Sequence, residues 1–351
     1  MKKILVDIDK TQNLFAGLGQ FSLHFAEELL KLAPKNIAID FLISTKKQRD
    51  LFPTHSRFTK TSFFQQFFSF LLAPYDIWHS LHQFPAILPS KKSNLILTIH
   101  DLNFLIEKNE LKSQRYLRKL QKNVDRAVCI TTISNYTKQQ IEKHLQLRGK
   151  EIHVIYNGIK PNNINQPEKP AFAINKPFLF SIGIFNQKKN FHTLVAMMEN
   201  LPELNLIIAG NNNTDYGRFV AQEIKRLNLS NIVLAGKISE SNKAWLYNHC
   251  DAFVFPSLAE GFGMPVIEAM TAGKPVFLST FTSLPEIGGE LAFYFQSFEP
   301  KEMAELIQDN LASVKTKQPG FSEATIKYAE KFDWNHCIKQ YAKVYQQILA
   351  Q

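Results

Sequence analysis

Two glutamates stand eight residues apart in the segment DAFVFPSLAEGFGMPVIEAMTAG, which covers residues 251–273. We expect Glu260 in a loop and Glu268 in the helix that follows this loop. The free N–H groups at the start of such a helix favour phosphate. Two carboxylates beside an anion site are costly unless they hold hydroxyl groups or a cation, and sugar and ribose hydroxyls are suitable partners. A glutamate near a helix N-terminus also complements the helix dipole, and the spacing alone leaves both interpretations open.

Glycine and proline mark the ends of the expected loop and helix. Gly261 and Gly263 allow the backbone to approach a ligand closely. Pro265 suits the first position of a helix, and Gly273 suits the position just after its last residue. The sequence therefore predicts a helix over 265–272 with a glycine-containing loop at its entrance.

A pair of lysines, Lys188 and Lys189, precedes a helix that we expect over 190–200. Two lysines at the start of this helix add to the positive end of its dipole, which favours an anionic ligand. The pair also fits a solvated basic turn, which is where two adjacent lysines usually lie. No Asp-x-Asp-like ligand set accompanies the lysines, so we expect no bound metal.

His100 and Asp101 directly follow an apolar run over 95–99, at the expected carboxyl end of a strand. Ligands of open α/β sheets bind outside the carboxyl ends of the strands, which makes His100 a candidate for ligand contact. The alternative is a histidine that only makes local backbone hydrogen bonds, with Asp101 orienting it. Gly17 and Gly19 would let a loop approach a ligand, or would form an ordinary tight turn.

Strand patterns and helical patterns alternate along the chain, which indicates parallel α/β sheets. Runs such as LILTI and VCITTI are continuously apolar, as expected for strands buried on both faces. The expected strands of the first half are 4–8, 37–43, 77–80, 95–99 and 128–132, with helices over 21–32 and 111–124. Those of the second half are 178–182, 204–209, 232–234, 252–255 and 275–278, with helices over 190–200, 216–227, 242–249 and 265–272.

The pattern restarts after a segment rich in proline and asparagine, so we predict two doubly wound, Rossmann-like α/β domains that face a central cleft. The predicted division is an N-terminal domain over 1–160, a linker over 161–177, a second domain over 178–334, and a final helical segment over 335–351. A length of 351 residues fits two domains.

Composition excludes several classes of protein. Hydrophobic residues make up 45% of the chain, too many for a disordered protein. Lys and Arg total 41 against 31 Asp and Glu, and this basic balance favours anionic partners without choosing among them. The three cysteines, Cys129, Cys250 and Cys337, lie far apart, which fits a reducing cytoplasm and argues against a structural zinc site. We expect no signal peptide and no transmembrane span.

The sequence resembles the retaining glycosyltransferases of family 4, which have the GT-B fold and an E-x7-E motif. The resemblance rests on the order and spacing of several fragments along most of the chain. These are GLGQF at 17–21, LTIHDLNF at 97–104, TTISNYTKQQI at 131–141, VIYNGI at 154–159, GIFNQKKN at 183–190, PSLAEGFGMPVIEAM at 256–270, SLPEIGG at 283–289 and FDW at 332–334.

The resemblance implies that the N-terminal domain holds the acceptor, the second domain holds a nucleotide-sugar, and the last helix returns to the N-terminal domain. It implies that His100 and Glu260 contact the transferred sugar as catalytic residues, and that Glu268 binds the ribose. Donor binding is further assigned to Gly17, Gly19, Lys188, Lys189, Gly261, Phe262 and Gly263. Many relatives carry Arg-Lys at the lysine pair, so Lys188 keeps the charge but loses bidentate geometry.

The implied reaction is transfer of a hexose with retention, and front-face attack and double displacement both stay open. GDP-mannose is the first expectation for the donor and a UDP-hexose the second, with no other cofactor. The acceptor would be a glycan or lipid-linked glycan of the cell envelope, such as a growing lipopolysaccharide or polysaccharide. The alternatives are a phosphorylase or epimerase of the same architecture, and a catalytically silent nucleotide-sugar-binding subunit. A phosphorylase would need a pyridoxal-bearing lysine and a longer chain.

Residues 107–126 carry seven Lys or Arg and three acids, and the basic residues recur at helical spacing. The nearby run FFQQFFSFLL at 63–72 is rich in phenylalanine. Together they suggest peripheral contact with an anionic membrane on the cytoplasmic side. The alternative is a solvated basic face and a core helix. We expect no nucleic-acid partner, because no stacking platform or known motif accompanies the basic residues.

Overall fold

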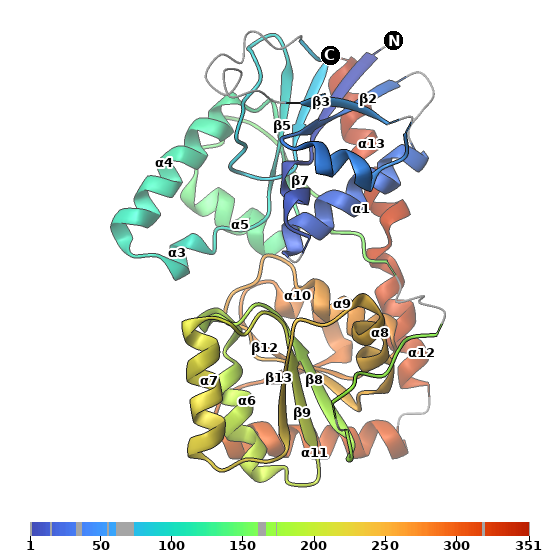
Figure 1. Cartoon of the computed structure of the whole chain (residues 1–351). Helices are drawn as coiled ribbons and strands as arrows, with labels where there is room; N and C mark the ends of the chain where they lie inside the picture. Colours follow the sequence, from blue (N-terminus) through green and yellow to red (C-terminus); the bar gives the residue numbers. More distant parts are fainter. Residues whose placement is uncertain are drawn as a thin grey trace. The chain divides into compact units, whose positions relative to one another are not determined.

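The protein, described from a computed structural model, consists of two compact units (Figure 1). Unit 1 comprises Met1–Gly158 and Phe332–Gln351, and unit 2 comprises Ile159–Lys331. The structure describes residues 2–14, 16–32, 37–54, 56–60, 74–160, 166–172, 174–317 and 320–350. The phenylalanine-rich run at 63–72 lies outside these residues, as do residues 161–165 of the predicted linker.

Unit 1 contains a seven-stranded parallel sheet with the strand order β3-β2-β1-β4-β5-β6-β7. Its strands are β1 Lys2–Asp7, β2 Ile37–Ile43, β3 Arg57–Lys60, β4 Ile77–Ser80, β5 Asn94–Ile99, β6 Cys129–Thr132 and β7 Ile152–Val154. The order reverses direction between β1 and β4, which makes this the switch point where open α/β sheets bind ligands. The predicted α/β class is confirmed.

The helices of unit 1 are α1 Gly17–Leu32, α3 Phe104–Glu107, α4 Glu110–Arg126, α5 Asn135–His144 and α13 Trp334–Ala350, with 3-10 turns η1 Asp9–Gln12 and η2 Lys46–Leu51. Side-chain caps begin two of them: Asn109 accepts from the N–H of Lys112 at 3.1 Å, and Ser134 accepts from that of Thr137 at 3.1 Å. Each cap satisfies a backbone N–H that has no partner within its own helix.

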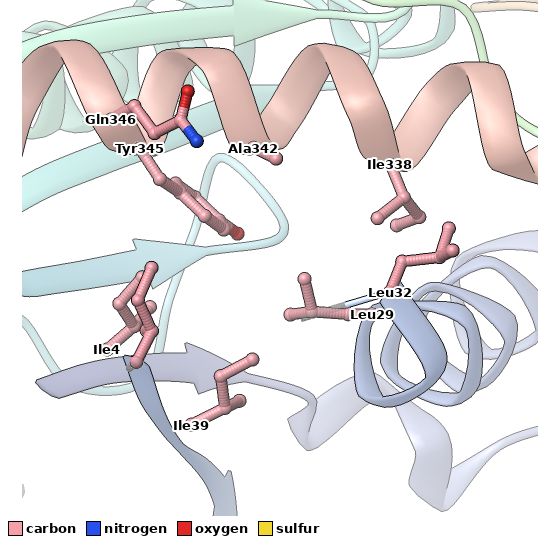
Figure 2. Close-up of a pocket in the computed structure, with 9 residues that line it drawn as sticks. Ile4, Leu29, Leu32, Ile39, Ile338, Ala342, Tyr345 and Gln346 are labelled. Atoms are coloured by element: carbon pink, nitrogen blue, oxygen red, sulfur yellow. The ribbon is translucent and has the colours of Figure 1, made fainter. Parts of the chain in front are cut away.

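The last helix of the chain, α13, belongs to the core of unit 1. Its buried face packs with β1 and α1, and Tyr345 Oη lies 2.6 Å from His79 Nδ1 in β4. Figure 2 shows Ile338 and Tyr345 of α13 lining a small pocket together with Ile4 of β1 and Leu29 of α1. The lining is mostly aliphatic, so we assign this pocket to the packing of the core and not to a catalytic site.

Unit 2 contains a six-stranded parallel sheet with the order β10-β9-β8-β11-β12-β13. Its strands are β8 Phe178–Ile182, β9 Asn205–Ala209, β10 Ile232–Gly236, β11 Ala252–Phe255, β12 Val276–Ser279 and β13 Ala292–Phe295. Its helices are α6 Phe191–Met197, α7 Asp215–Arg226, α8 Glu240–His249, α9 Met264–Thr271, α10 Leu284–Gly288, α11 Pro300–Lys317 and α12 Phe321–Ala329. Helices α6, α7 and α11 pack together on one face, and α9 packs with α10 and α12 on the other (Figure 1).

Part of the segment that the sequence analysis treats as a linker packs on unit 2. The backbone N–H of Glu168 donates to Ser241 Oγ at 2.9 Å, and Asn242 Nδ2 donates to the carbonyl oxygen of Glu168 at 2.9 Å. The ammonium of Lys169 lies 5.7 Å from the centre of the Trp245 ring. These contacts attach the segment to α8.

Candidate active site

The centre of the candidate site in unit 2 is an ion pair between Lys189 and Glu260. Lys189 Nζ lies 2.6 Å from Glu260 Oε1, and Ser257 Oγ donates to the same oxygen at 2.6 Å. Both charged side chains are nearly buried. Burial alone would raise the pKa of Glu260, but the charges of Lys189 and Lys188 and the two hydrogen bonds together lower it. Glu260 is therefore a carboxylate at neutral pH, and its Oε2 accepts no hydrogen bond from the described residues.

The carboxyl edge of the sheet positions Lys189. It lies in the 3-10 turn η4 Gln187–Lys189, which follows β8, and the next residue Asn190 has a left-handed φ of 57°. A Cβ at Gly183 would come within 2.9 Å of Lys189 Cε, so the absence of a side chain there leaves room for the lysine stem. The ammonium lies 4.5 Å from the centre of the Phe255 ring at the end of β11.

Lys188 joins this turn to the loop between β11 and α9 through its backbone. Its carbonyl oxygen accepts from the N–H of Leu258 at 2.7 Å and lies 3.1 Å from Ser257 Oγ. The charge of Lys188 also contributes to the lowered pKa of Glu260. The structure thus brings the side chain of Lys189 to Glu260, and the backbone of Lys188 to the loop that carries Glu260.

The loop that carries Glu260 is held from the segment after β12. The N–H of Glu260 donates to Thr282 Oγ1 at 3.0 Å, and Ser283 Oγ donates to the carbonyl oxygens of Glu260 at 3.1 Å and Phe262 at 3.0 Å. Phe262 is buried, and Gly263 has a φ of 107°, a conformation that favours glycine. Gly261 lies between these anchored positions. The hydroxyls of Thr282 and Ser283, which sequence analysis did not assign to this role, fix the loop.

Glu268 lies in α9 and forms a second cluster with side chains of α8. Tyr247 Oη donates to Glu268 Oε2 at 2.8 Å, and Lys243 Nζ lies 3.2 Å from Oε1 and 2.7 Å from a carboxylate oxygen of Glu240. Burial lowers the pKa of Lys243, but the two carboxylates outweigh it and raise the pKa overall. Sequence analysis missed Lys243 and Tyr247. Their spacing of four residues on a predicted helix was the available signal, since it puts both on one face.

His100 follows β5 in unit 1, where its ring is buried. His100 Nε2 lies 2.7 Å from the carbonyl oxygen of Leu81, and the ring meets that of Phe21 edge-on at 5.0 Å. Burial lowers the pKa of His100 to about 4, against a small opposing effect of the Leu81 hydrogen bond. The neutral ring donates from Nε2 and leaves Nδ1 as an acceptor. A carbonyl thus orients His100, while Asp101 Oδ1 accepts from the N–H of Asn103 at 3.0 Å.

The two predicted N-terminal glycines lie in the first turn of a helix. Helix α1 begins at Gly17, four residues earlier than the sequence indicates. A Cβ on Gly19 would lie 2.0 Å from the carbonyl oxygen of Asn13 and 2.9 Å from that of Lys10. Gly19 is therefore required for close packing of α1 against the η1 segment.

No helix among the described residues is long and apolar enough to cross a bilayer. In the same part of the chain, no group of three or more His, Cys, Asp or Glu is arranged to hold a metal ion.

Two parallel sheets of this topology are those of the GT-B fold of glycosyltransferases. Comparison with known families agrees: the model for glycosyl transferases group 1 matches residues 162–332, and that for glycosyltransferase family 4 matches residues 33–163. The chain belongs to these family 4 glycosyltransferases, so the predicted family and transferase activity are confirmed.

Curated relatives share between a fifth and a third of their residues with the chain. An uncharacterized glycosyltransferase of Methanocaldococcus jannaschii is 28% identical over 281 residues, covering 78% of this chain and 76% of the relative. The O-antigen chain mannosyltransferase RfbU of Salmonella typhimurium is 23% identical over 335 residues, covering 87% and 90%.

Solved structures confirm the GT-B fold. Sucrose-phosphate synthase from Thermosynechococcus elongatus superimposes with a TM-score of 0.79 at 17% identity and covers 100% of both chains. HepE from Anabaena in complex with UDP-glucose gives a TM-score of 0.76 at 18% identity, covering 99% of this chain and 100% of HepE.

Proposed function

We propose that this glycosyltransferase moves a hexose, first of all mannose from GDP-mannose, to a growing envelope glycan with retention at the anomeric carbon. The observation that carries the proposal is the Lys189–Glu260 pair at the carboxyl edge of the unit 2 sheet, in which Glu260 Oε2 accepts no hydrogen bond from the described residues. The name of the O-antigen mannosyltransferase among the relatives supports mannose as the sugar.

In this proposal the lysines bind the leaving group. Negative charge builds on the diphosphate as the glycosidic bond breaks, and the ammonium groups of Lys188 and Lys189 stabilise it where it develops. Glu260 Oε2 accepts a hydrogen bond from a hydroxyl of the transferred hexose. Glu268 binds the ribose hydroxyls. The departing phosphate oxygen takes the proton of the acceptor hydroxyl in front-face attack, so the reaction needs neither an enzyme nucleophile nor a metal.

Transfer assays test this proposal and the choice of donor. The protein would be incubated with radiolabelled GDP-mannose or UDP-glucose, bacterial glycolipid extract and excess EDTA, followed by chromatography of the lipid fraction. We expect label in the glycolipid from GDP-mannose, undiminished by EDTA. Transfer only from UDP-glucose would identify a UDP-hexose enzyme. Donor binding without transfer from either nucleotide would support the silent-subunit alternative and reject the proposal.

Glu260→Gln separates the sugar contact from nucleotide binding. The amide keeps the shape but removes the charge that pairs with Lys189. We expect turnover to fall much more than GDP affinity, since the carboxylate contacts the transferred hexose. Glu323→Gln, on the exposed side of α12, is the matched control. An unchanged turnover of Glu260→Gln would remove Glu260 from the reaction.

We further propose that unit 1 docks on an anionic membrane from the cytoplasmic side, where a lipid-linked acceptor would lie. Two apolar side chains next to the basic residues are exposed: Ile106 by 58% and Leu111 by 84%. The basic residues of α3, α4 and the turn between them are Lys108, Lys112, Arg115, Arg118, Lys119, Lys122 and Arg126. Exposed apolar side chains beside cations are the features that bind an anionic bilayer surface.

Vesicle flotation tests membrane docking. We expect the protein to float with phosphatidylglycerol vesicles at low salt and to stay in solution with phosphatidylcholine. Leu111→Glu should abolish flotation because it places a negative charge beside anionic lipid. Phe219→Glu, at a side chain of α7 that is 41% exposed, is the matched control and should float normally. If Leu111→Glu and Phe219→Glu float to the same extent, the α4 surface is not the part of the protein that binds the membrane.

A further inference from the structure

Two nearly buried polar side chains lie at the carboxyl edge of the unit 1 sheet, and neither belongs to the residues discussed so far. Asp7 is the last residue of β1 and is 4% exposed, and His82 follows β4 and is 7% exposed. Asp7 pairs with Ser80 in the register of the sheet, and Ser80 Oγ donates to the carbonyl oxygen of His82 at 3.0 Å. Both therefore stand at the β1–β4 switch point.

Asp7 has one carboxyl oxygen without a hydrogen-bond partner among the described residues. Its Oδ1 accepts from the N–H of Asp9 at 3.0 Å, whereas its Oδ2 accepts no hydrogen bond from the described residues. Burial raises the pKa of Asp7 to about 7, with the charge of Asp9 adding to it and the Asp9 hydrogen bond and Lys10 opposing it. The side chain is nearly buried, but Oδ2 itself is not fully covered, so a ligand can reach it.

His82 has one ring nitrogen without a hydrogen-bond partner in the part of the chain that the structure describes. Its Nδ1 accepts from the N–H of Phe84 at 3.0 Å, so the proton of the neutral ring is on Nε2. Burial, with the charges of Lys10, His100 and Lys119, lowers the pKa of His82 to about 3, which keeps the ring neutral. No described residue accepts a hydrogen bond from Nε2. His82 therefore presents a fixed donor.

Lys10 lies in η1, three residues after Asp7, and its charge acts on the pKa of both Asp7 and His82. The η1 segment that carries Lys10 packs so closely against α1 that only a glycine fits at position 19. The edge thus offers a free acceptor oxygen, a free N–H donor and an ammonium group, held by rigid elements. This combination suits the adjacent hydroxyl groups of a sugar, each of which both donates and accepts.

We propose that Asp7 and His82, with Lys10 beside them, bind two hydroxyl groups of the acceptor saccharide. Asp7 Oδ2 accepts from one hydroxyl, and His82 Nε2–H donates to the oxygen of the other. The identity of this ligand as the acceptor rests on the proposed function, because the donor contacts of that function lie in unit 2.

Two substitutions test the site with small probes. Asp7→Asn keeps the oxygen that Asp9 needs and replaces the free acceptor by an N–H donor, and His82→Gln removes the ring donor. Binding of methyl α-mannoside and of α-1,2-, α-1,3- and α-1,6-mannobiose would be followed by saturation-transfer NMR, and GDP binding by calorimetry. We expect saccharide affinity to fall by roughly tenfold in each variant, as for loss of one well-placed hydrogen bond to a charged or fixed group. GDP affinity should stay within roughly twofold.

Matched controls remove the same functional groups elsewhere in unit 1. Asp76→Asn changes an acid that pairs with Lys2 before β4, and His144→Gln changes a half-buried histidine at the end of α5. Neither should alter saccharide affinity. Equal saccharide binding by wild type and both test variants overturns the proposal, and so does wild-type protein that binds none of the four saccharides.

The two proposals fail in different ways. If the wild type transfers no mannose but the two variants still lose saccharide binding, the site stands and the proposed function fails. If transfer from GDP-mannose occurs and both variants keep native saccharide affinity, the function stands and the site fails. A circular dichroism melting curve for each variant confirms that it is folded before binding is measured.

Discussion

The carboxyl edges of the two sheets differ in the charge state of their polar side chains. Unit 2 holds full charges in pairs, since Lys189 lies 2.6 Å from Glu260 and the pKa of that carboxyl is lowered. Unit 1 holds groups that burial pushes toward neutrality, with a pKa of about 7 for Asp7 and about 3 for His82. The two edges therefore suit different ligands. The fixed charges of unit 2 suit a diphosphate, and the neutral donors and acceptors of unit 1 suit a sugar.

The difference has a local cause in each unit. In unit 2, η4 brings a lysine stem under Gly183 and over Phe255, so a cation is available where the carboxylate is buried. In unit 1, Asp9 and Lys10 stand next to Asp7 with opposite effects on its pKa, and burial decides the outcome. Substitutions that remove the cation of unit 2 or the ionisable group of unit 1 therefore test the two edges separately.

The largest effect is expected from removing the cation of unit 2. Lys189→Met keeps the methylene stem but leaves Glu260 nearly buried without its partner. We expect the free energy of unfolding to fall by about 3 kcal/mol, since breaking a buried ion pair leaves an uncompensated charge. GDP binding should weaken by about 1.5–3 kcal/mol through loss of a charge-assisted hydrogen bond. Urea denaturation and calorimetry measure the two effects.

The control for this variant is Lys2→Met, which removes an exposed ion pair at 3.3 Å from Asp76 and should change neither quantity appreciably. A destabilised Lys189→Met protein with native GDP affinity would make the pair purely structural. The contrast between the two edges would then carry no functional meaning.

An intermediate effect is expected from the pH dependence of stability that Asp7 confers. The pKa of Asp7 is raised from 3.8 to about 7 in the folded protein, so folding favours the protonated form. Its contribution is greatest below about pH 4, is lost as the pH rises to about 7, and is constant above that. An asparagine side chain cannot ionise, so the Asp7→Asn variant does not lose stability as the pH rises. It should be more stable than the wild type at pH 8, by on the order of 3 kcal/mol. At pH 4 it should have no such advantage.

Melting temperatures at pH 4, 6 and 8 measure this effect, with Asp76→Asn as the control. The pKa of Asp76 is lowered, chiefly by the hydrogen bond from the N–H of Lys3, so its substitution should destabilise the protein at pH 8 if it acts at all. A pH-independent difference between Asp7→Asn and wild type would show that Asp7 ionises normally. A gain in stability together with weaker saccharide binding is the pattern expected of a residue kept for function.

Much of the fold could be predicted from the sequence because the central strands are short apolar runs with clear ends. The expected strands 37–43 and 77–80 coincide with β2 and β4. Strands β3, β7 and β13 were not predicted. Strands β3 and β7 are three or four residues long, only partly buried and contain charged or polar side chains. The start of α1 was placed too late because glycine disfavours helices, whereas Gly19 is needed there for packing.

The candidate site could be predicted as positions but not as contacts. The spacing of Glu260 and Glu268 and the position of Lys189 follow from the sequence, but the pairing of Lys189 with Glu260 depends on how η4 meets the loop after β11. Lys243 and Tyr247 are ordinary helix residues in sequence, and only the packing of α8 beside α9 brings them to Glu268. Tertiary contacts of this kind carry no local pattern.

The smallest effect tests whether α8 positions Glu268 for ribose binding. Tyr247→Phe removes the hydrogen bond to Glu268 Oε2 and leaves the ring packing in place. We expect GDP affinity to fall by about 1 kcal/mol, the usual value of one hydrogen bond. The loss should be absent for 2′,3′-dideoxy-GDP, because this nucleotide lacks the hydroxyls that the oriented carboxylate would bind.

Tyr294→Phe is the matched control, since Tyr294 Oη donates to the carbonyl oxygen of Gly289 at 2.7 Å in another part of unit 2. It should leave the affinities of both nucleotides unchanged. Equal losses of GDP and dideoxy-GDP affinity in Tyr247→Phe would mean that the tyrosine only stabilises the fold. A loss confined to GDP would extend the contrast between the units, because the ion pairs of unit 2 would then orient hydroxyl-binding carboxylates as well as bind phosphate.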